Sequence, residues 1–142
     1  MRLIPSCSMY INPYLHYYNK KLKKVRPDYY KQTTGLTGLF VDDSPHRTLS
    51  TLYGRILRSL QQVPESAAYR KYTEPLVKQR LILVESEPDP QKLEERIGMG
   101  QLEEVIEQAE YELRTCRAII DSKAWEPLVE QPPKGQWNWP IA

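Results

Sequence analysis

The chain has 142 residues, a net charge of +2 at pH 7 and a mean hydropathy of −0.63, which indicates one soluble domain with appendages. Its longest aliphatic run, Leu81-Ile82-Leu83-Val84, is far too short to cross a bilayer. The two cysteines, Cys7 and Cys116, lie so far apart in the sequence that neither a disulfide framework nor a cysteine metal site is expected.

Residues 1–31 form a basic N-terminal arm. They hold seven Lys or Arg and one acidic residue, whereas residues 32–142 hold thirteen Lys or Arg and seventeen Asp or Glu. Three interpretations of the arm stay open: a disordered basic tail, a presequence, or a segment translated from an upstream start codon that is not normally used. Its Lys residues, interleaved with Tyr, could contact nucleic acid or an anionic membrane, although a solvated tail is the simpler interpretation.

A bundle domain is predicted over residues 32–124, and its first helix from about Ser44 to Val63. Ser44 can cap the helix and Pro45 suits its first turn. Apolar residues recur at the spacing of one buried helical face. They are Leu49, Leu52, Tyr53, Ile56, Leu57, Leu60 and Val63.

The second helix is predicted from about Ser66 to Ser86. Its expected inner face comprises Tyr69, Tyr72, Leu76, Val77, Leu83 and Val84. Pro75 lacks an N–H group and its ring collides with the carbonyl group of Lys71, so a kink or a restart is expected there.

The third helix opens at Asp89-Pro90, breaks at Gly98-Met99-Gly100 and restarts at Gln101 to run to about Lys123. The part after Gln101 has one apolar face, and the other face is acidic and is expected to be solvated. The acidic residues are Glu103, Glu104, Glu107, Glu110 and Glu112. Because no strand pattern occurs, the predicted fold is all-α: an antiparallel three-helix bundle with a basic N-terminal arm and an extended Trp/Pro-rich C-terminal tail.

The tail covers residues 125–142 and contains all three Trp residues among four Pro residues. Trp137 and Trp139 are two apart, so on an extended chain they face the same side, and Pro140 stiffens the backbone beside them. We therefore predict Trp137, Trp139 and Pro140 as contacts with a partner. Trp125, at the end of the third helix, is expected to pack back on the bundle.

A second candidate interface lies in the stretch Ala67–Glu74. Tyr69 and Tyr72 share a helical face, and Arg70 can pair with Glu74 one turn later. Two interpretations stay open at this point: an ordinary amphipathic turn, or a surface that binds a partner through Tyr69, Arg70, Tyr72 and Glu74.

Residues suited to catalysis are not grouped in the sequence. His16 and His46 lie apart, residues 33–38 lack the Gly-Lys-Ser/Thr of a phosphate loop, and the acidic pairs have no His beside them. We therefore predict no catalytic residue, no metal and no cofactor, and a chain that is not itself an enzyme.

Several blocks of the sequence, in order, resemble one known family. They are residues 31–39, 67–74, 87–89, 92–94, 100–106, 108–110, 125–130 and 136–140. The family they resemble is subunit five of the alpha subcomplex of mitochondrial NADH:ubiquinone oxidoreductase, respiratory complex I.

The resemblance implies a non-catalytic accessory subunit that packs on core and accessory subunits of the matrix arm of complex I and supports respiratory electron transport. It implies a peripheral position on the matrix side of the mitochondrial inner membrane, without a membrane span, nucleic acid or cofactor. The alternative is a freestanding helical adaptor that uses its basic arm on nucleic acid or anionic membrane.

Overall fold

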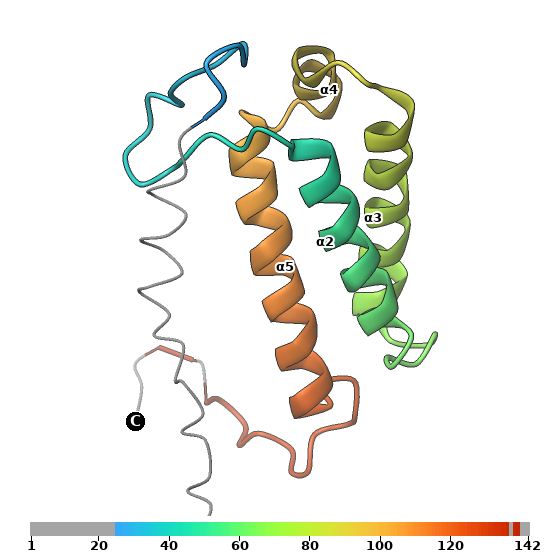
Figure 1. Cartoon of the computed structure of the whole chain (residues 1–142). Coiled ribbons are helices and arrows are strands. Elements are labelled where there is room, and N and C mark those ends of the chain that lie inside the picture. Colours follow the sequence, from blue (N-terminus) through green and yellow to red (C-terminus); the bar gives the residue numbers. More distant parts are fainter. Residues whose placement is uncertain (1–24, 137, 140–142) are drawn as a thin grey trace, which may run out of the picture.

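Four α-helices make up the body of the chain in the computed structural model, which describes residues 25–136 and 138–139 (Figure 1). They are α2 (Pro45–Leu60), α3 (Ala68–Ser86), α4 (Pro90–Ile97) and α5 (Leu102–Ser122). No β-strand occurs in the part of the chain that the structure describes, so the all-α prediction is confirmed at that level. The number of helices differs from the predicted three, because the third predicted helix is two separate helices.

Helix α2 forms where its apolar pattern predicts, although the side chain of Ser44 does not make the predicted capping hydrogen bond. Pro45 occupies the first turn, and the apolar face from Leu49 to Leu60 is buried. The helix ends three residues earlier than predicted. Residues 59–63 continue instead as tight turns in which the N–H groups of Gln62 and Val63 donate to carbonyl groups three residues back. Val63 is nevertheless buried, as its position in the pattern indicates.

Helix α3 runs without a break across Pro75, so the predicted restart does not occur. The predicted inner face is only partly right. Val77 and Val84 are buried, whereas Tyr72 is 80% exposed and Leu76 is 49% exposed. The reason is geometric. Val77 and Val84 are seven residues apart and define the face toward α2, whereas Leu76 lies about a quarter of a turn away from that face and Tyr72 lies farther still.

Two glycines separate α4 from α5. Gly98 follows the last turn of α4 with φ of 63°, the left-handed conformation that ends helices. Gly100 has φ of 84°, and a Cβ atom there would collide with the carboxylate of Glu104. That carboxylate accepts a hydrogen bond from the backbone N–H group of Gln101 at 2.8 Å and so caps α5.

Helix α2 is the central helix of the body. It packs against both α3 and α5, while α4 crosses one end and contacts the same two helices (Figure 1). Figure 1 shows that α2 and α5 run in the same direction and that α3, which lies between them in the sequence, runs in the opposite direction. The buried core joins all four helices. It comprises Leu49, Leu52, Tyr53, Ile56, Leu60, Val77, Val84, Leu93, Leu102, Val105, Ile106, Ala109, Leu113 and Cys116.

The segment before α2 is fastened to the start of α5 by polar groups. The Nζ atom of Lys31 lies 2.6 Å from a carboxylate oxygen of Glu103, which is only 3% exposed. Gln101 donates from its side-chain amide to the carbonyl group of the buried Thr34 at 2.9 Å. The predicted solvated acidic face is therefore wrong at Glu103, because Lys31 neutralises this carboxylate and allows its burial.

Candidate partner interface

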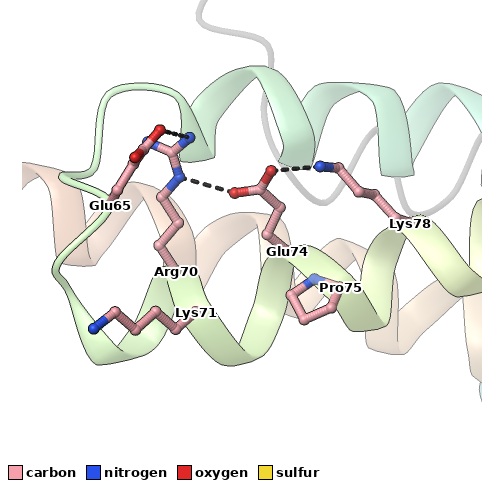
Figure 2. Close-up of a pocket in the computed structure, with 6 residues that line it drawn as sticks. All are labelled: Glu65, Arg70, Lys71, Glu74, Pro75 and Lys78. Carbon is pink, nitrogen blue, oxygen red and sulfur yellow. Dashed lines mark hydrogen bonds and ion pairs between the residues drawn. The ribbon is translucent and has the colours of Figure 1, made fainter.

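An ion network on α3 contains two of the predicted interface residues. Arg70 donates from Nε to Glu74 at 2.9 Å, and Lys78 lies 2.6 Å from the other oxygen of the same carboxylate. Arg70 also donates to the backbone carbonyl group of Val63 at 2.7 Å, which ties α3 to the loop that precedes it. Figure 2 shows Arg70, Glu74 and Lys78 in one row along the helix. The predicted Arg70–Glu74 pair is thus present.

This network borders a hollow of about 300 Å³, lined by Glu65, Arg70, Lys71, Glu74, Pro75 and Lys78. The hydrogen bonds from Arg70 and then Lys78 lower the pKa of Glu74 to about 2. Lys71 points away from the row and carries no drawn interaction (Figure 2). The hollow is therefore lined by three cations and two carboxylates. Because Arg70 and Lys78 already bind Glu74, these side chains stabilise α3 as well as lining its surface.

The two predicted tyrosines do not lie together with that network. Tyr69 donates its hydroxyl hydrogen to Glu112 of α5 at 2.5 Å. Burial raises the pKa of Tyr69, and this hydrogen bond raises it further. Tyr72 instead projects into solvent. The structure therefore divides the predicted stretch: Tyr69 bridges two helices, Arg70 and Glu74 form a network, and Tyr72 is free for contact.

The tail begins beside the body and then leaves it. Trp125 is half-buried and shares a hollow of about 310 Å³ with residues of the α2–α3 loop and α5. Beyond it, Leu128, Val129 and Trp139 are exposed, with 87% of Trp139 accessible. Trp137 and Pro140 lie outside the described residues, so their predicted contacts remain predictions.

A groove between α3 and α5 is a feature that the sequence analysis missed. It has a volume of about 350 Å³, with residues of α2 at its base. Its lining residues are Tyr53, Ile56, Leu76, Val77, Arg80, Gln108, Ala109, Tyr111, Glu112 and Thr115. Tyr111 stands apart from the apolar face of α5, and this isolated aromatic residue among polar neighbours was the available sequence signal.

Two further properties concern function directly. No described helix combines the length and the apolar composition that a membrane crossing requires. Among residues 25–136 and 138–139, no three His, Cys, Asp or Glu side chains gather in a way that could hold a metal ion.

Comparison with known proteins identifies the family. Residues 38–104 match the family described as "ETC complex I subunit conserved region". A relative from Caenorhabditis elegans, named probable NADH dehydrogenase (ubiquinone) 1 alpha subcomplex subunit 5, is 67% identical over 134 residues, covering 94% of this chain and 89% of the relative. The chain belongs to the complex I alpha subcomplex subunit 5 family.

Other members of the subunit 5 family show how far the similarity extends. The Bos taurus protein of that name is 56% identical over 111 residues, which cover 78% of this chain and 96% of that protein. An Arabidopsis thaliana relative, whose name adds "mitochondrial", is 41% identical over 67% of this chain and 56% of that relative. Because the nematode match covers 94% of the chain, most of residues 1–31 must lie within it.

Proposed function

We propose that this chain is a non-catalytic accessory subunit of mitochondrial NADH:ubiquinone oxidoreductase that supports respiratory electron transport through the stability or assembly of the complex. The observation that carries the proposal is the nematode relative, which is 67% identical over nearly the full length of both chains and is named as subunit 5 of the alpha subcomplex. Similarity this high over a whole domain favours the same place in the same assembly.

The engagement of the charged side chains supports a structural role. Lys31 and Glu103 hold the pre-helical segment on α5, and Arg70, Glu74 and Lys78 bind one another along α3. In both places the charged groups are paired with one another, Lys31 with Glu103 and Arg70 and Lys78 with Glu74, which favours a role in holding the fold together.

A peripheral position on the matrix side of the inner membrane, against the matrix arm, is the second part of the proposal. In it α2, α3 and α5 act as an antiparallel three-helix bundle, and the Trp/Pro-rich tail lies on a neighbouring subunit. The exposure of Leu128, Val129 and Trp139 supports such a tail contact, because apolar groups left in water gain free energy when a partner covers them.

Native-gel separation of mitochondrial membranes tests the proposal. A tagged copy of this chain is expressed in cells that lack the endogenous protein, and NADH:ubiquinone oxidoreductase activity is measured on the same gel. We expect the tag to co-migrate with that activity and its loss to lower the amount of intact complex. A tag found only at the mass of the free chain, or bound to nucleic acid or vesicles, would favour the freestanding adaptor instead.

Sidedness has its own test. The tag should resist protease in intact mitochondria and in vesicles with the matrix face enclosed, and it should be cleaved once the inner membrane is opened. It should also leave the membrane under conditions that detach peripheral proteins from the complex. Cleavage of the tag in mitochondria that have lost only the outer membrane would contradict a matrix-side position.

A further inference from the structure

Helix α2 turns a basic face to solvent. Arg47, Arg55 and Arg58 are all exposed, and we call them the α2 arginine face. Their spacing of eight and three residues places them within about a quarter of a turn of one another, opposite the buried side of the helix. At roughly 1.5 Å per residue the row is about 16 Å long. Helix α2 contains no Asp or Glu, so its own sequence supplies no counter-charge to this face.

The rest of the described chain does not supply that counter-charge either. Among the residues that the structure describes, none of the three arginines forms an ion pair. Arg58 donates from Nε to the backbone carbonyl group of Gly54 at 3.3 Å, which leaves its charge uncompensated. On α3, which packs against α2, Glu74 already binds two cations, Arg70 and Lys78. The α2 arginine face therefore presents three unpaired cations to whatever lies against it.

The position of these arginines does not favour the stability of the free chain. Arg47 lies in the first turn of α2, where the positive end of the helix dipole favours acids and opposes cations, and this turn holds no acidic residue. Arg55 and Arg58 are three residues apart, so their like charges repel one another. Only Arg58, in the last turn, suits the helix dipole. A row of like charges that breaks local rules in this way indicates a role outside the chain.

We propose that the α2 arginine face docks on an acidic segment of a neighbouring subunit, whose carboxylates pair with Arg47, Arg55 and Arg58. This inference deepens the proposed function and rests on it, because it names a surface by which the chain binds within its complex. A guanidinium group donates two parallel hydrogen bonds to one carboxylate, and arginine is enriched among the residues that dominate binding at interfaces. A partner carboxylate beside Arg47 also lies near the start of α2, where the helix dipole favours negative charge.

A second copy of the chain fits this face less well. Its own α2 would bring arginines against arginines, and like charges oppose association. Its α5, the helix with the most acidic residues, offers a face of mixed charge. At spacings of three and four residues, one side of α5 carries Glu107, Glu110, Arg114 and Arg117. Charge complementarity therefore favours a segment of another subunit that carries carboxylates without interleaved cations.

An anionic membrane and single-stranded nucleic acid are also weaker matches. Surfaces that lie in a membrane interface insert apolar side chains beside their cations, and surfaces that hold single strands add aromatic side chains on which bases stack. None of the exposed large apolar or aromatic side chains of the described residues belongs to α2. Between the arginines the exposed side of the helix carries the small polar Thr51. Such a face suits ion pairs with protein carboxylates.

The first test reverses charge on and off the face. Arg47→Glu and Arg55→Glu change the face, and Lys92→Glu is the matched control, because Lys92 is an exposed cation at the same first-turn position of α4 that Arg47 has in α2. Each variant is expressed in cells, and incorporation into the large complex is measured in competition with tagged wild-type chain. We expect each change on the face to lower incorporation about tenfold and Lys92→Glu to match the wild type.

The second test separates binding from folding. Because an acid suits the first turn of a helix, the free Arg47→Glu chain should melt at or above the wild-type temperature while its incorporation falls. A residue that serves the fold would instead lower both quantities together. Thermal melts followed by circular dichroism measure the first quantity. If Arg47→Glu lowers the melting temperature of the free chain and Arg55→Glu does the same, these arginines belong to the fold and the proposal is overturned.

A third measurement uses the wild-type chain and so does not depend on the folding of any variant. The arginine-directed reagent phenylglyoxal is applied to the intact complex and to the free chain. We expect Arg47, Arg55 and Arg58 to be modified in the free chain and protected in the complex. Equal modification in both states overturns the proposal.

The partner carboxylate can be identified with Arg55→Lys. This change keeps the positive charge and so should retain most incorporation, and it introduces an amine that a zero-length carbodiimide reagent joins to a carboxylate in direct contact. In the intact complex we expect position 55 to be coupled to an Asp or Glu of another subunit. Coupling only within the chain contradicts the proposal.

The outcomes also separate this proposal from the one on which it rests. If wild-type chain co-migrates with the complex while Arg47→Glu and Arg55→Glu incorporate as well as Lys92→Glu, the α2 proposal fails and the accessory-subunit proposal stands. If wild-type chain does not co-migrate, both fail. Coupling of position 55 to a second copy of the chain overturns the acidic segment of another subunit. So does normal incorporation of Arg47→Glu together with lost binding to vesicles of neutral and anionic phospholipid.

Discussion

The two non-helical ends of the described chain reverse the usual distribution of polar and apolar residues. Before α2, the charged Lys31 and Glu103 are brought together at 2.6 Å with little exposure to water. After α5, the apolar Leu128 and Val129 and the aromatic Trp139 are left in solvent. One end is thus held by buried charge, and the other carries apolar surface without a cover.

The contrast separates what the fold needs from what an assembly needs. A buried pair costs stability when either partner is lost, so the Lys31 end belongs to the folded domain. Exposed aromatic residues contribute little to the free chain and gain only when a partner covers them. We expect mutations at the first end to change the stability of the free chain and mutations at the second end to change assembly.

The largest effect is expected at the buried pair. Lys31→Met should lower the free energy of unfolding by about 3 kcal/mol, because Glu103 is left as an unpaired buried charge. Chemical denaturation of the free chain measures this change. Adding Glu103→Leu to Lys31→Met should restore much of the loss.

Arg26→Met provides the matched control for that experiment, since Arg26 forms an exposed ion pair with Asp43 at 3.8 Å. It should cost less than about 1 kcal/mol. If Lys31→Met and Arg26→Met have equal effects, the buried pair is no more important to folding than a surface contact, and the contrast between the two ends loses its basis.

The tail should respond in assembly. Trp137→Ala combined with Trp139→Ala is expected to lower incorporation into the large complex by about tenfold while leaving the helix content of the free chain unchanged. Competition with wild-type chain on native gels measures the first quantity and circular dichroism the second. Lys134→Ala, at an exposed polar position of the same tail, is the control for a nonspecific effect. A lower melting temperature of the free double variant would place these tryptophans in the fold.

Trp125 marks the boundary between the two behaviours. Because it is half-buried against the α2–α3 loop and α5, Trp125→Ala should lower the stability of the free chain by about 1–2 kcal/mol, less than the cost of a fully buried Trp. Thermal melts of the free protein measure the effect. If Trp125→Ala changed only assembly, Trp125 would belong with the residues of the tail that contact a partner.

Alkaline pH should lower the stability that the Lys31–Glu103 pair provides, and it should not act through Trp137 and Trp139. Burial lowers the pKa of Lys31, but the hydrogen bond and attraction of Glu103 outweigh it, so the folded-state pKa is raised above 10.5. The pair therefore stabilises fully below about pH 10.5, and this contribution is lost as the pH rises through the folded-state pKa. Melting temperatures from pH 8 to 11 should fall less steeply in Lys31→Met than in wild type. The Trp137 and Trp139 variants should follow the wild-type curve, and a divergence between them would contradict this assignment.

Acid should have the smallest effect, through the exposed network of α3. The pKa of Glu74 is about 2 in the folded chain against 4.5 for an ordinary carboxyl group, so its contribution is present above pH 4.5 and is lost as the pH falls toward 2. Glu74→Gln should show a flatter acid profile than wild type. Glu95→Gln, at an exposed carboxylate, should leave the profile unchanged. Identical profiles for the two variants would show that the network adds nothing to stability.

The helices could be predicted because their causes are local. The apolar spacing from Leu49 to Leu60 and the Gly98 break both act within a few residues. The face of α3 was harder, because Tyr72 and Leu76 are apolar although they point outward, and a helix with apolar residues on several faces has no unique inner side in its pattern.

The candidate interface was predictable only in part. Arg70 and Glu74 are one turn apart, so their pairing follows from helical spacing. Lys31 and Glu103 are 72 positions apart, and the partner of Tyr69 is 43 positions away, so only the packing of distant segments decides these contacts. The groove has the same origin, because its two sides come from α3 and α5 and its base from α2.

The central position of α2 has a consequence for how the domain opens. Helices α3 and α5 each pack on α2, and side chains such as Tyr69 and Glu112 bridge them directly. If α3 moves away, its interface with α2, its contacts with α4 and the Tyr69–Glu112 hydrogen bond are lost, while α2 and α5 stay together. Amide hydrogens in α2 should then exchange with solvent only in global unfolding, and those of α3 should exchange through a smaller, local opening.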